Sequence, residues 1–273
     1  MSSKTVLITG TSSGIGLATA VAAARSGWHV VATMRDTSKA SALRNAADQA
    51  GVPVDIRVLD VTDPASVATC LAGLDRLDAL VNNAGAGHLG TLEQENIDDV
   101  CAVMEVNFYG VLEVTKAALP LLRASGGRVV TVTSVGGVVG QPFNEAYCAA
   151  KFAVEGFMES LAPVAATVGV AVSVVEPGAV ASEFVSNVGD TDALLEDAGP
   201  YAPALSAYLD RTRGAFAAAQ AADDVAARMV ELLESPRPPF RVLTSDTARA
   251  FAGTKLADLD GSAVQALTGG WIA

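Results

Sequence analysis

The sequence has few of the residues that build metal sites and disulfide frameworks. Its 273 residues include two histidines and three well-separated cysteines, Cys70, Cys101 and Cys148. So few cysteines exclude a disulfide-stapled secreted scaffold, and neither residue type is frequent enough to favour a zinc site. A reducing compartment suits these cysteines best. We therefore expect a cytoplasmic protein without a bound metal.

Basic residues and long hydrophobic runs are also scarce. Eighteen Lys and Arg against 30 Asp and Glu give a formal net charge of −12, which repels nucleic-acid phosphates and anionic lipid surfaces. No apolar run approaches the roughly 18 residues that a membrane span requires. The first ten residues also lack the apolar stretch of a secretory signal. We expect no nucleic-acid partner and no membrane span.

What the chain does contain is an alternation of short and long apolar segments. Hydrophobic residues make up 51% of the sequence and charged residues 18%, which excludes a disordered chain. Short runs rich in Val and Ile, apolar throughout, indicate strands buried on both faces. These runs are Thr5–Thr9, His29–Met34, Asp55–Leu59, Ala79–Asn82, Arg128–Thr133, Ala171–Glu176 and Phe240–Leu243. The segments with helix-forming composition are Ile15–Ser26, Ser41–Ala50, Pro64–Gly73, Val100–Arg123, Tyr147–Thr167 and Ala222–Glu234.

This alternation predicts one α/β domain over residues 1–273. Its fold is expected to be doubly wound (Rossmann), with a seven-stranded parallel sheet and helices on both faces. The segment Gly178–Phe216 breaks the pattern with Gly, Pro, Ala and acidic residues. We predict an irregular lid over the functional site there, because long unpatterned segments in compact domains are usually functional. The residues after Leu243 are too weakly patterned to interpret.

A glycine-rich turn follows the first strand and opens the first helix, where backbone amides and the helix dipole favour a pyrophosphate. Its candidate binding residues are Gly10, Ser12, Ser13, Gly14, Ile15 and Gly16. Alone, this turn is also compatible with an ordinary strand-to-helix connection. A second polar turn, Asn83, Ala84 and Gly85, ends the fourth strand and belongs to the same sheet edge.

Ser134 ends the fifth strand, and Tyr147 and Lys151 follow at the start of the next helix. The i,i+4 spacing puts the phenol and the ammonium on one helix face, where the cation stabilises a phenolate. A surface Tyr–Lys pair without a function is the alternative. These motifs, together with Asn107 and Pro177-Gly178, resemble the short-chain dehydrogenase/reductase family from about Thr5 to Leu243.

Within that family, Val30–Asp36 and Ser134–Cys148 are similar to the branch of 17β-hydroxysteroid and retinol dehydrogenases. One departure is that no histidine follows His88, whereas the estrogen-active member of the branch uses a late histidine. Estrogen is therefore not the expected substrate. The resemblance implies a ketone or aldehyde and its alcohol as the reacting pair. The apolar side chains of the lid favour a hydrophobic substrate, although they are equally compatible with packing alone.

The resemblance also implies residue roles. Tyr147 is expected to be the general acid and base, Lys151 to lower its pKa and hold the ribose, and Ser134 to bind the substrate oxygen. Asn107 resembles a residue that holds a water next to the lysine; a backbone-bonded asparagine is the alternative. The other implied cofactor contacts are Asp60, Val61, Asn83, Ala84, Gly85, Pro177, Gly178, Val180 and Ser182. Asp60 is also compatible with a helix cap.

The end of the second strand predicts the cofactor. Met34 occupies the position where an acid would accept from the ribose of NAD, and Arg35 follows it, which suits the 2′-phosphate of NADP. NADP(H) is therefore expected over NAD(H), with Asp36 as the competing ribose acceptor. Two other functions stay open: an acyl-thioester ketoreductase with a carrier-protein partner, and a catalytically idle cofactor sensor. Apolar residues on several sides of Val100–Arg123 and Tyr147–Thr167 predict a homodimer or homotetramer.

Overall fold

The computed structural model describes residues 3–181, 191–217 and 219–273. Its centre is a seven-stranded sheet in the order β3-β2-β1-β4-β5-β6-β9, in which every neighbouring pair is parallel. The strands are β1 (Thr5–Thr9), β2 (His29–Met34), β3 (Asp55–Val58), β4 (Ala79–Asn82), β5 (Arg128–Val132), β6 (Ala171–Glu176) and β9 (Arg241–Leu243). The order reverses between β1 and β4, which creates a crevice at their carboxyl ends.

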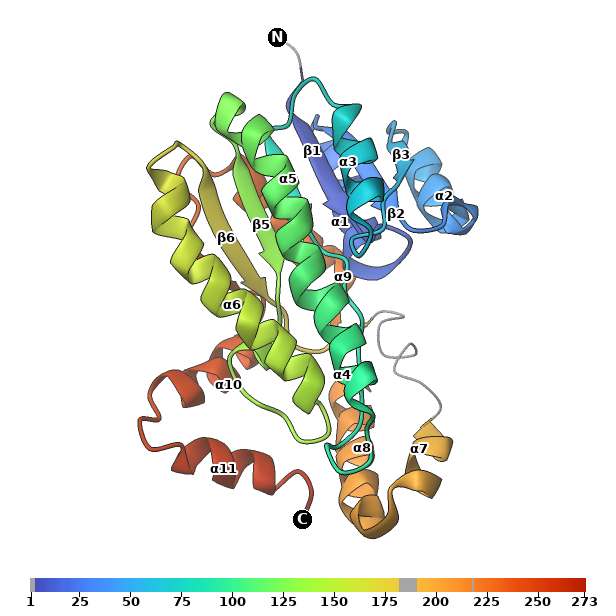
Figure 1. The fold of residues 1–273 in the computed structure, drawn as a ribbon, viewed down its shortest axis with the longest axis vertical. Helices are drawn as coiled ribbons and strands as arrows, with labels where there is room; N and C mark the ends of the chain where they lie inside the picture. Colours follow the sequence, from blue (N-terminus) through green and yellow to red (C-terminus); the bar gives the residue numbers. More distant parts are fainter. Residues whose placement is uncertain (1–2, 182–190, 218) are drawn as a thin grey trace.

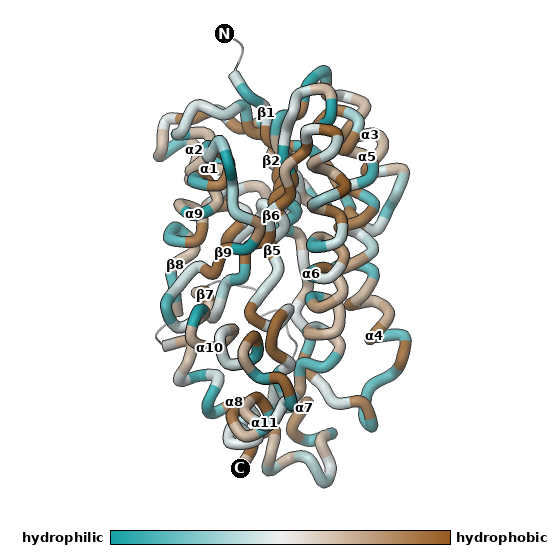
Figure 2. The backbone as a smooth tube through the Cα atoms, turned by 90° about the vertical axis from the view of Figure 1, so that its left-hand side faces the viewer, coloured by the Kyte–Doolittle hydropathy of each residue, from teal (hydrophilic) through white to brown (hydrophobic). Residues whose placement is uncertain are grey.

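Helices cover both faces of this sheet, as the apolar strands predict (Figures 1 and 2). One face is covered by α1 (Gly14–Arg25), α2 (Ser41–Ala50) and α9 (Ala222–Glu234), with Met229 and Leu43 fully buried. The other is covered by α3 (Pro64–Ala72), α5 (Gly110–Ser125) and α6 (Glu145–Ala166), with Val114 and Met158 fully buried. The prediction of a doubly wound α/β fold is confirmed.

The expected single helix Val100–Arg123 is wrong in detail. The chain forms α4 (Ile97–Met104), a π-helical turn over Glu105–Tyr109, and then α5. Asn107, at the centre of the turn, is fully buried and bonds the loop after β4 through its amide. The wider turn re-aims this side chain toward the crevice, as π-bulges often do at functional sites.

The expected irregular lid is also wrong where the structure describes it. After β7 (Val180–Ala181), the described residues form α7 (Thr191–Asp197), a 3₁₀ turn (Gly199–Tyr201) and α8 (Ala202–Ala217), and β7 pairs with β8 (Gln220–Ala221). Helix α8 forms because Leu205, Tyr208 and Leu209, spaced for one helix face, are buried together with Phe143. Residues 182–190 lie outside the described part.

The segment after β9 contains α10 (Asp246–Leu256) and α11 (Ser262–Gly269). These helices, together with α7 and α8, gather at the end of the molecule opposite the N-terminus, beyond the carboxyl ends of the strands (Figure 1). Among the helices of the described ranges, none is long and apolar enough to cross a membrane.

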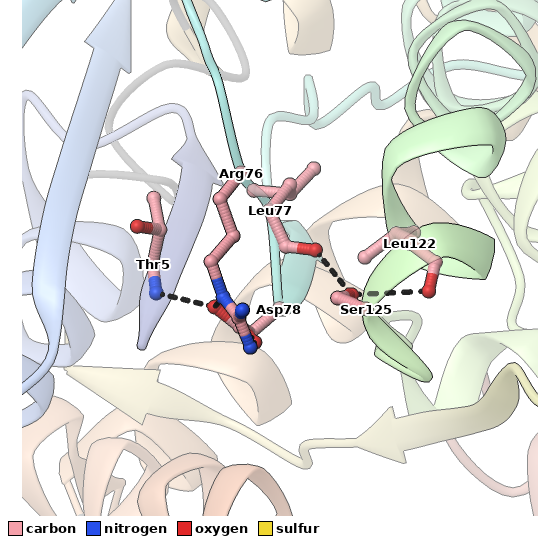
Figure 3. Close-up of polar contacts among 6 residues, drawn as sticks. All are labelled: Thr5, Arg76, Leu77, Asp78, Leu122 and Ser125. Carbon is pink, nitrogen blue, oxygen red and sulfur yellow. Dashed lines mark hydrogen bonds and ion pairs between the residues drawn. The ribbon is translucent and has the colours of Figure 1, made fainter. Parts of the chain in front are cut away.

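The opposite, amino-terminal edge of the sheet is closed by a compact polar cluster (Figure 3). Buried Asp78, just before β4, accepts from the Thr5 amide at 2.8 Å and from Arg76 Nη2 at 2.6 Å. Ser125 Oγ donates to the Leu77 carbonyl at 2.6 Å. Burial opposes ionisation of Asp78, but the donors and the Arg76 charge outweigh it and lower its pKa.

Candidate active site

The glycine turn after β1 allows a ligand to approach the main chain closely at this edge of the sheet. Gly10 and Gly14 have positive φ values of 69° and 56°, which only glycine adopts without strain. A Cβ on Gly16 would lie 2.2 Å from the Gly10 carbonyl oxygen, so close helix–strand packing requires glycine there. Ser13 precedes α1, and its side chain caps no helix amide in the described structure. The first amides of α1 therefore remain available to a phosphate.

The turn after β4 is bonded directly to this glycine turn. Asn83 Nδ2 donates to the Thr9 and Gly10 carbonyls, each at 2.9 Å, and the amides of Asn83 and Ala84 both donate to Thr9 Oγ1 at 3.0 Å. The two predicted cofactor turns thus form one rigid unit at the switch point of the sheet.

The end of β2 presents one cation beside this unit. Met34 is buried and Arg35 is exposed. The Asp36 carboxylate accepts from the Ser38 amide at 2.9 Å and caps the following 3₁₀ turn. Hydrogen bonding by the Ser38 side chain and then by its amide lowers the pKa of Asp36.

Ser134 and Tyr147 meet at the carboxyl end of β5. Ser134 begins the 3₁₀ turn Val135–Gly137 and accepts from the Gly136 amide at 2.9 Å. Desolvation raises the pKa of the Tyr147 phenol to about 12, while a hydrogen bond with Ser134 lowers it in part. At neutral pH the phenol therefore keeps its proton next to the serine.

Lys151 lies one helical turn beyond Tyr147 on the same face of α6. Its ammonium donates to the Val132 carbonyl at 3.2 Å and lies 5.7 Å from the Tyr147 ring centroid. Only 4% of the residue is exposed. Burial lowers the pKa of Lys151 to about 8, and the charge of Glu155 opposes this shift. Lysine and tyrosine thus depart from their usual pKa values at one place, as is frequent in active sites.

Asn107 completes this group from the π-turn. Its Nδ2 donates to the carbonyls of Ala86 and Val103, and its Oδ1 accepts from the Ala86 amide. The side chain is therefore backbone-bonded, the alternative that the sequence left open. A Cβ on Gly85 would lie 2.9 Å from Asn107 Oδ1 and 3.6 Å from Lys151 Nζ, so a glycine lets these groups approach.

The remaining predicted contacts are distributed around the crevice. Asp60 Oδ1 accepts from the Thr62 amide and hydroxyl, whereas Asp63 is the cap of α3. Val61 is buried against Gly110. The other contacts lie after β6: the Pro177 carbonyl accepts from the Val135 amide, Gly178 follows, and Val180 begins β7. Ser182 lies outside the described residues.

Three charged residues next to Lys151 were missed in the sequence. Glu155, Glu176 and Arg241 come from α6, β6 and β9, and both carboxylates are buried. A signal was present, because Glu176 ends an otherwise apolar strand and Glu155 follows Lys151 by four positions in an apolar helix.

A phosphate-sized glycine cradle beside a buried Tyr–Lys pair is the arrangement of a dinucleotide-dependent oxidoreductase. The short chain dehydrogenase family matches residues 4–193. Retinol dehydrogenase 8 of Bos taurus is 40% identical over 271 residues, covering 95% of this chain and 87% of that protein. Human 17-beta-hydroxysteroid dehydrogenase type 1 is 38% identical over 274 residues, covering 96% and 84%.

Among solved structures, an actinorhodin polyketide ketoreductase variant with NADPH superposes with a TM-score of 0.74 at 27% identity, over 88% of this chain and 95% of that one. The chain belongs to the short-chain dehydrogenase family, in the branch of the retinol and 17β-hydroxysteroid dehydrogenases. It is an oxidoreductase that acts on CH–OH or C=O groups.

Proposed function

We propose that the protein is an NADP(H)-dependent oxidoreductase that interconverts a hydrophobic ketone or aldehyde and its alcohol. The observation that carries this proposal is the position of Tyr147, which is hydrogen-bonded with Ser134 and packed beside the Lys151 ammonium at the carboxyl edge of the sheet. A protonated phenol in this place is suited to donate its proton to a developing alkoxide.

Three side chains divide the chemistry. In carbonyl reduction, Tyr147 gives its proton to the substrate oxygen while Ser134 hydrogen-bonds that oxygen and stabilises its charge. Lys151 stabilises the resulting phenolate, because an ammonium nearby favours the charged form. When bound, the nicotinamide cofactor supplies or accepts the hydride. Asn107 keeps the Gly85–Ala86 backbone against Lys151.

The glycine cradle and the turn after β4 would hold the cofactor's pyrophosphate and ribose. The expected contacts are the cofactor-binding residues predicted from the sequence. They lie in the segments that follow β1, β3, β4 and β6, and they include Ser182. The preference for NADP(H) rests on Arg35, whose guanidinium is exposed at the end of β2 and suits a 2′-phosphate. Asp36, whose Oδ1 accepts from the Ser38 amide, keeps its other oxygen as an acceptor and remains the competitor for the ribose.

The proposed substrate class is supported by an apolar cluster next to the start of α6. We infer that residues 1–273 form one catalytic domain and that residues 178–216 act as its lid. Phe143, directly before α6, has a positive φ of 58° and packs against Tyr208 of α8. Leu205 and Leu209 join this apolar cluster. The names of the relatives, retinol and 17-beta-hydroxysteroid dehydrogenases, support a bulky apolar substrate.

An acyl-thioester ketoreductase is the second candidate, supported by the likeness to a polyketide ketoreductase. The net charge of −12 disfavours it, since an acidic carrier protein would be repelled. A catalytically idle sensor is disfavoured by the complete Ser134, Tyr147 and Lys151 set.

We also propose a homodimer or homotetramer formed through α5 and α6. A groove of about 620 Å³ lies along α5, between α6 and the start of α3, and its lining includes Tyr109, Leu112, Phe157 and Leu161. Tyr109 is 50% exposed and Phe157 42% exposed, and large apolar side chains gathered at a groove favour burial by a second copy. Sedimentation as a monomer at micromolar concentration would contradict this.

The proposed reaction is tested by assaying steroid, retinoid, aryl and short charged carbonyl compounds with NADPH and with NADH, following loss of nicotinamide absorbance. We expect turnover of apolar carbonyl compounds with NADPH, at least about tenfold better in kcat/KM than of charged keto acids. Tyr147→Phe is the matched inactive control. A preference for a small anionic keto acid would contradict the proposed substrate class.

A further inference from the structure

Three consecutive residues at the end of β5 each hold one residue of α6. The Val132 carbonyl accepts from Lys151, Thr133 Oγ1 donates to Glu155, and Ser134 is hydrogen-bonded with Tyr147. Two of these three bonds belong to the proposed active site. The bond between Thr133 and Glu155 lies in the same series, and the proposed function gives it no role.

Glu155 is held more firmly than a helix-surface glutamate. Only 5% of the residue is exposed. Besides Thr133, Arg241 Nη2 of β9 donates to Glu155 Oε2 at 3.2 Å. A Cβ on Gly137 would lie 3.0 Å from Glu155 Cγ and 3.1 Å from the Lys151 carbonyl oxygen. The turn after Ser134 thus packs closely against both residues, and glycine at position 137 is what allows this approach.

The charges around Glu155 come from every element packed on it. Lys151 and Glu159 come from α6, fully buried Glu176 from β6 and Arg241 from β9. Arg241 Nε contacts Glu176 Oε1 at 2.5 Å, and Glu159 lies 3.9 Å from Arg241 at the exposed margin. With both buried carboxylates ionised, their charges balance those of Arg241 and Lys151.

The two carboxylates are not equivalent. Burial and the neighbouring Glu155 charge raise the pKa of Glu176 to about 7. Burial also raises the pKa of Glu155, but Thr133 and Arg241 both donate to it and oppose that shift. Glu176 therefore takes up a proton before Glu155, and Glu155 keeps its charge near Lys151.

We propose that Glu155 is a positioning residue for Lys151: its carboxylate, fixed by Thr133 and Arg241, keeps the buried ammonium charged over the working pH range. The inference rests on the proposed function of Tyr147 and Lys151. Glu155 itself touches neither substrate nor cofactor. It acts through Lys151, which precedes it by one helical turn on the buried face of α6.

The test is the pH profile of kcat in Glu155→Gln, with Glu159→Gln as the matched control on the same helix. Without the Glu155 charge, Lys151 loses its proton at lower pH, so the alkaline limb should move down by about one pH unit. That corresponds to roughly tenfold lower activity on the limb at a given pH. Glu155→Asp should return the limb toward its original pH, and Glu159→Gln should leave it unchanged.

A second readout needs no turnover. In the cofactor-free protein, burial lowers the pKa of Lys151 to about 8, whereas in the unfolded chain the lysine has its ordinary, higher pKa. Between these two pKa values the unfolded chain binds more protons than the folded protein, so stability rises with pH. In Glu155→Gln this rise should begin at lower pH. If the glutamine variant does not fold, Glu155→Met serves, because Arg241 retains Glu176 as its partner.

The outcomes separate the two proposals. If Glu155→Gln or Glu155→Met lowers kcat equally at all pH values and leaves both profiles in place, Glu155 is merely structural and the inference is overturned. If Tyr147→Phe keeps wild-type activity, the proposed function fails, whatever Glu155 does. An alkaline limb that moves in Glu155→Gln but not in Glu159→Gln supports the inference.

Discussion

The two edges of the sheet use buried charge in opposite ways. At the amino-terminal edge, Asp78 is surrounded by donors and its pKa is lowered, so its stable form is the charged one (Figure 3). At the carboxyl edge, burial raises the pKa of Tyr147 and lowers that of Lys151. The charged form of a buried group is stabilised at one edge, whereas at the other burial shifts the pKa values of both groups toward their neutral forms, a perturbation that is frequent in active sites.

The largest effect expected at the carboxyl edge is that of Tyr147→Phe. It removes the proposed proton donor but little binding surface, so kcat should fall by 10²-fold or more while cofactor affinity stays nearly constant. Steady-state kinetics and cofactor titration measure the two quantities. Retention of more than about a tenth of wild-type kcat would remove Tyr147 from its assigned role.

At the amino-terminal edge, Asp78→Asn should reduce stability and spare activity. Arg76 and the Thr5 amide lose a charged acceptor. We expect the free energy of unfolding to fall by about 1–3 kcal/mol, toward the lower end because Arg76 is half-exposed. Chemical denaturation measures it, with exposed Asp75→Asn as control. A clear drop in kcat with unchanged stability would contradict the assignment of Asp78 to stability rather than to activity.

A smaller change is expected at the end of β2. Arg35→Asp replaces the exposed cation with an acid that would repel a 2′-phosphate, so the preference between NADPH and NADH should reverse, each way by about tenfold. Comparable kcat/KM values for the two cofactors in the unaltered protein would instead assign the ribose to Asp36.

The smallest effect is expected from the pH dependence of Glu176. Its pKa in the folded protein is raised from 4.5 to about 7, so the folded state binds the extra proton and stability decreases as pH rises between these values. Glu176→Gln should flatten that slope, by about 1–2 kcal/mol between pH 5 and pH 8 after allowance for the Arg241 contact. An unchanged slope would show that Glu176 is ionised throughout.

The sequence predicted the features that depend on local spacing. Continuous apolar runs predicted the buried strands. The glycine positions and the Tyr147–Lys151 spacing predicted motifs that need no more than one strand and one helix. The π-turn around Asn107 was not predicted, because spacing along the chain does not reveal the bond of Asn107 to Ala86 of another loop. The helix α8 was missed because its Ala-rich sequence has a weak apolar pattern, and its buried face is defined by packing against the distant Phe143.

The Glu155 cluster was missed for a related reason, although Glu155 and Glu176 each stand out in an apolar segment. Its three charged members come from α6, β6 and β9, and only the sheet order brings β9 next to β6. Spacing along the chain reveals pairs on one element, whereas this cluster exists only after the sheet has assembled.

Hydride transfer at the carboxyl edge is tested most directly by isotope transfer. The protein is incubated with an apolar ketone and NADPH deuterated at the transferred position of the nicotinamide, and the alcohol is analysed by mass spectrometry. The account predicts deuterium on the carbinol carbon with the unaltered protein, and with Tyr147→Phe a yield at least about 10²-fold lower. Alcohol formed without deuterium, or labelled equally well by Tyr147→Phe, would contradict it.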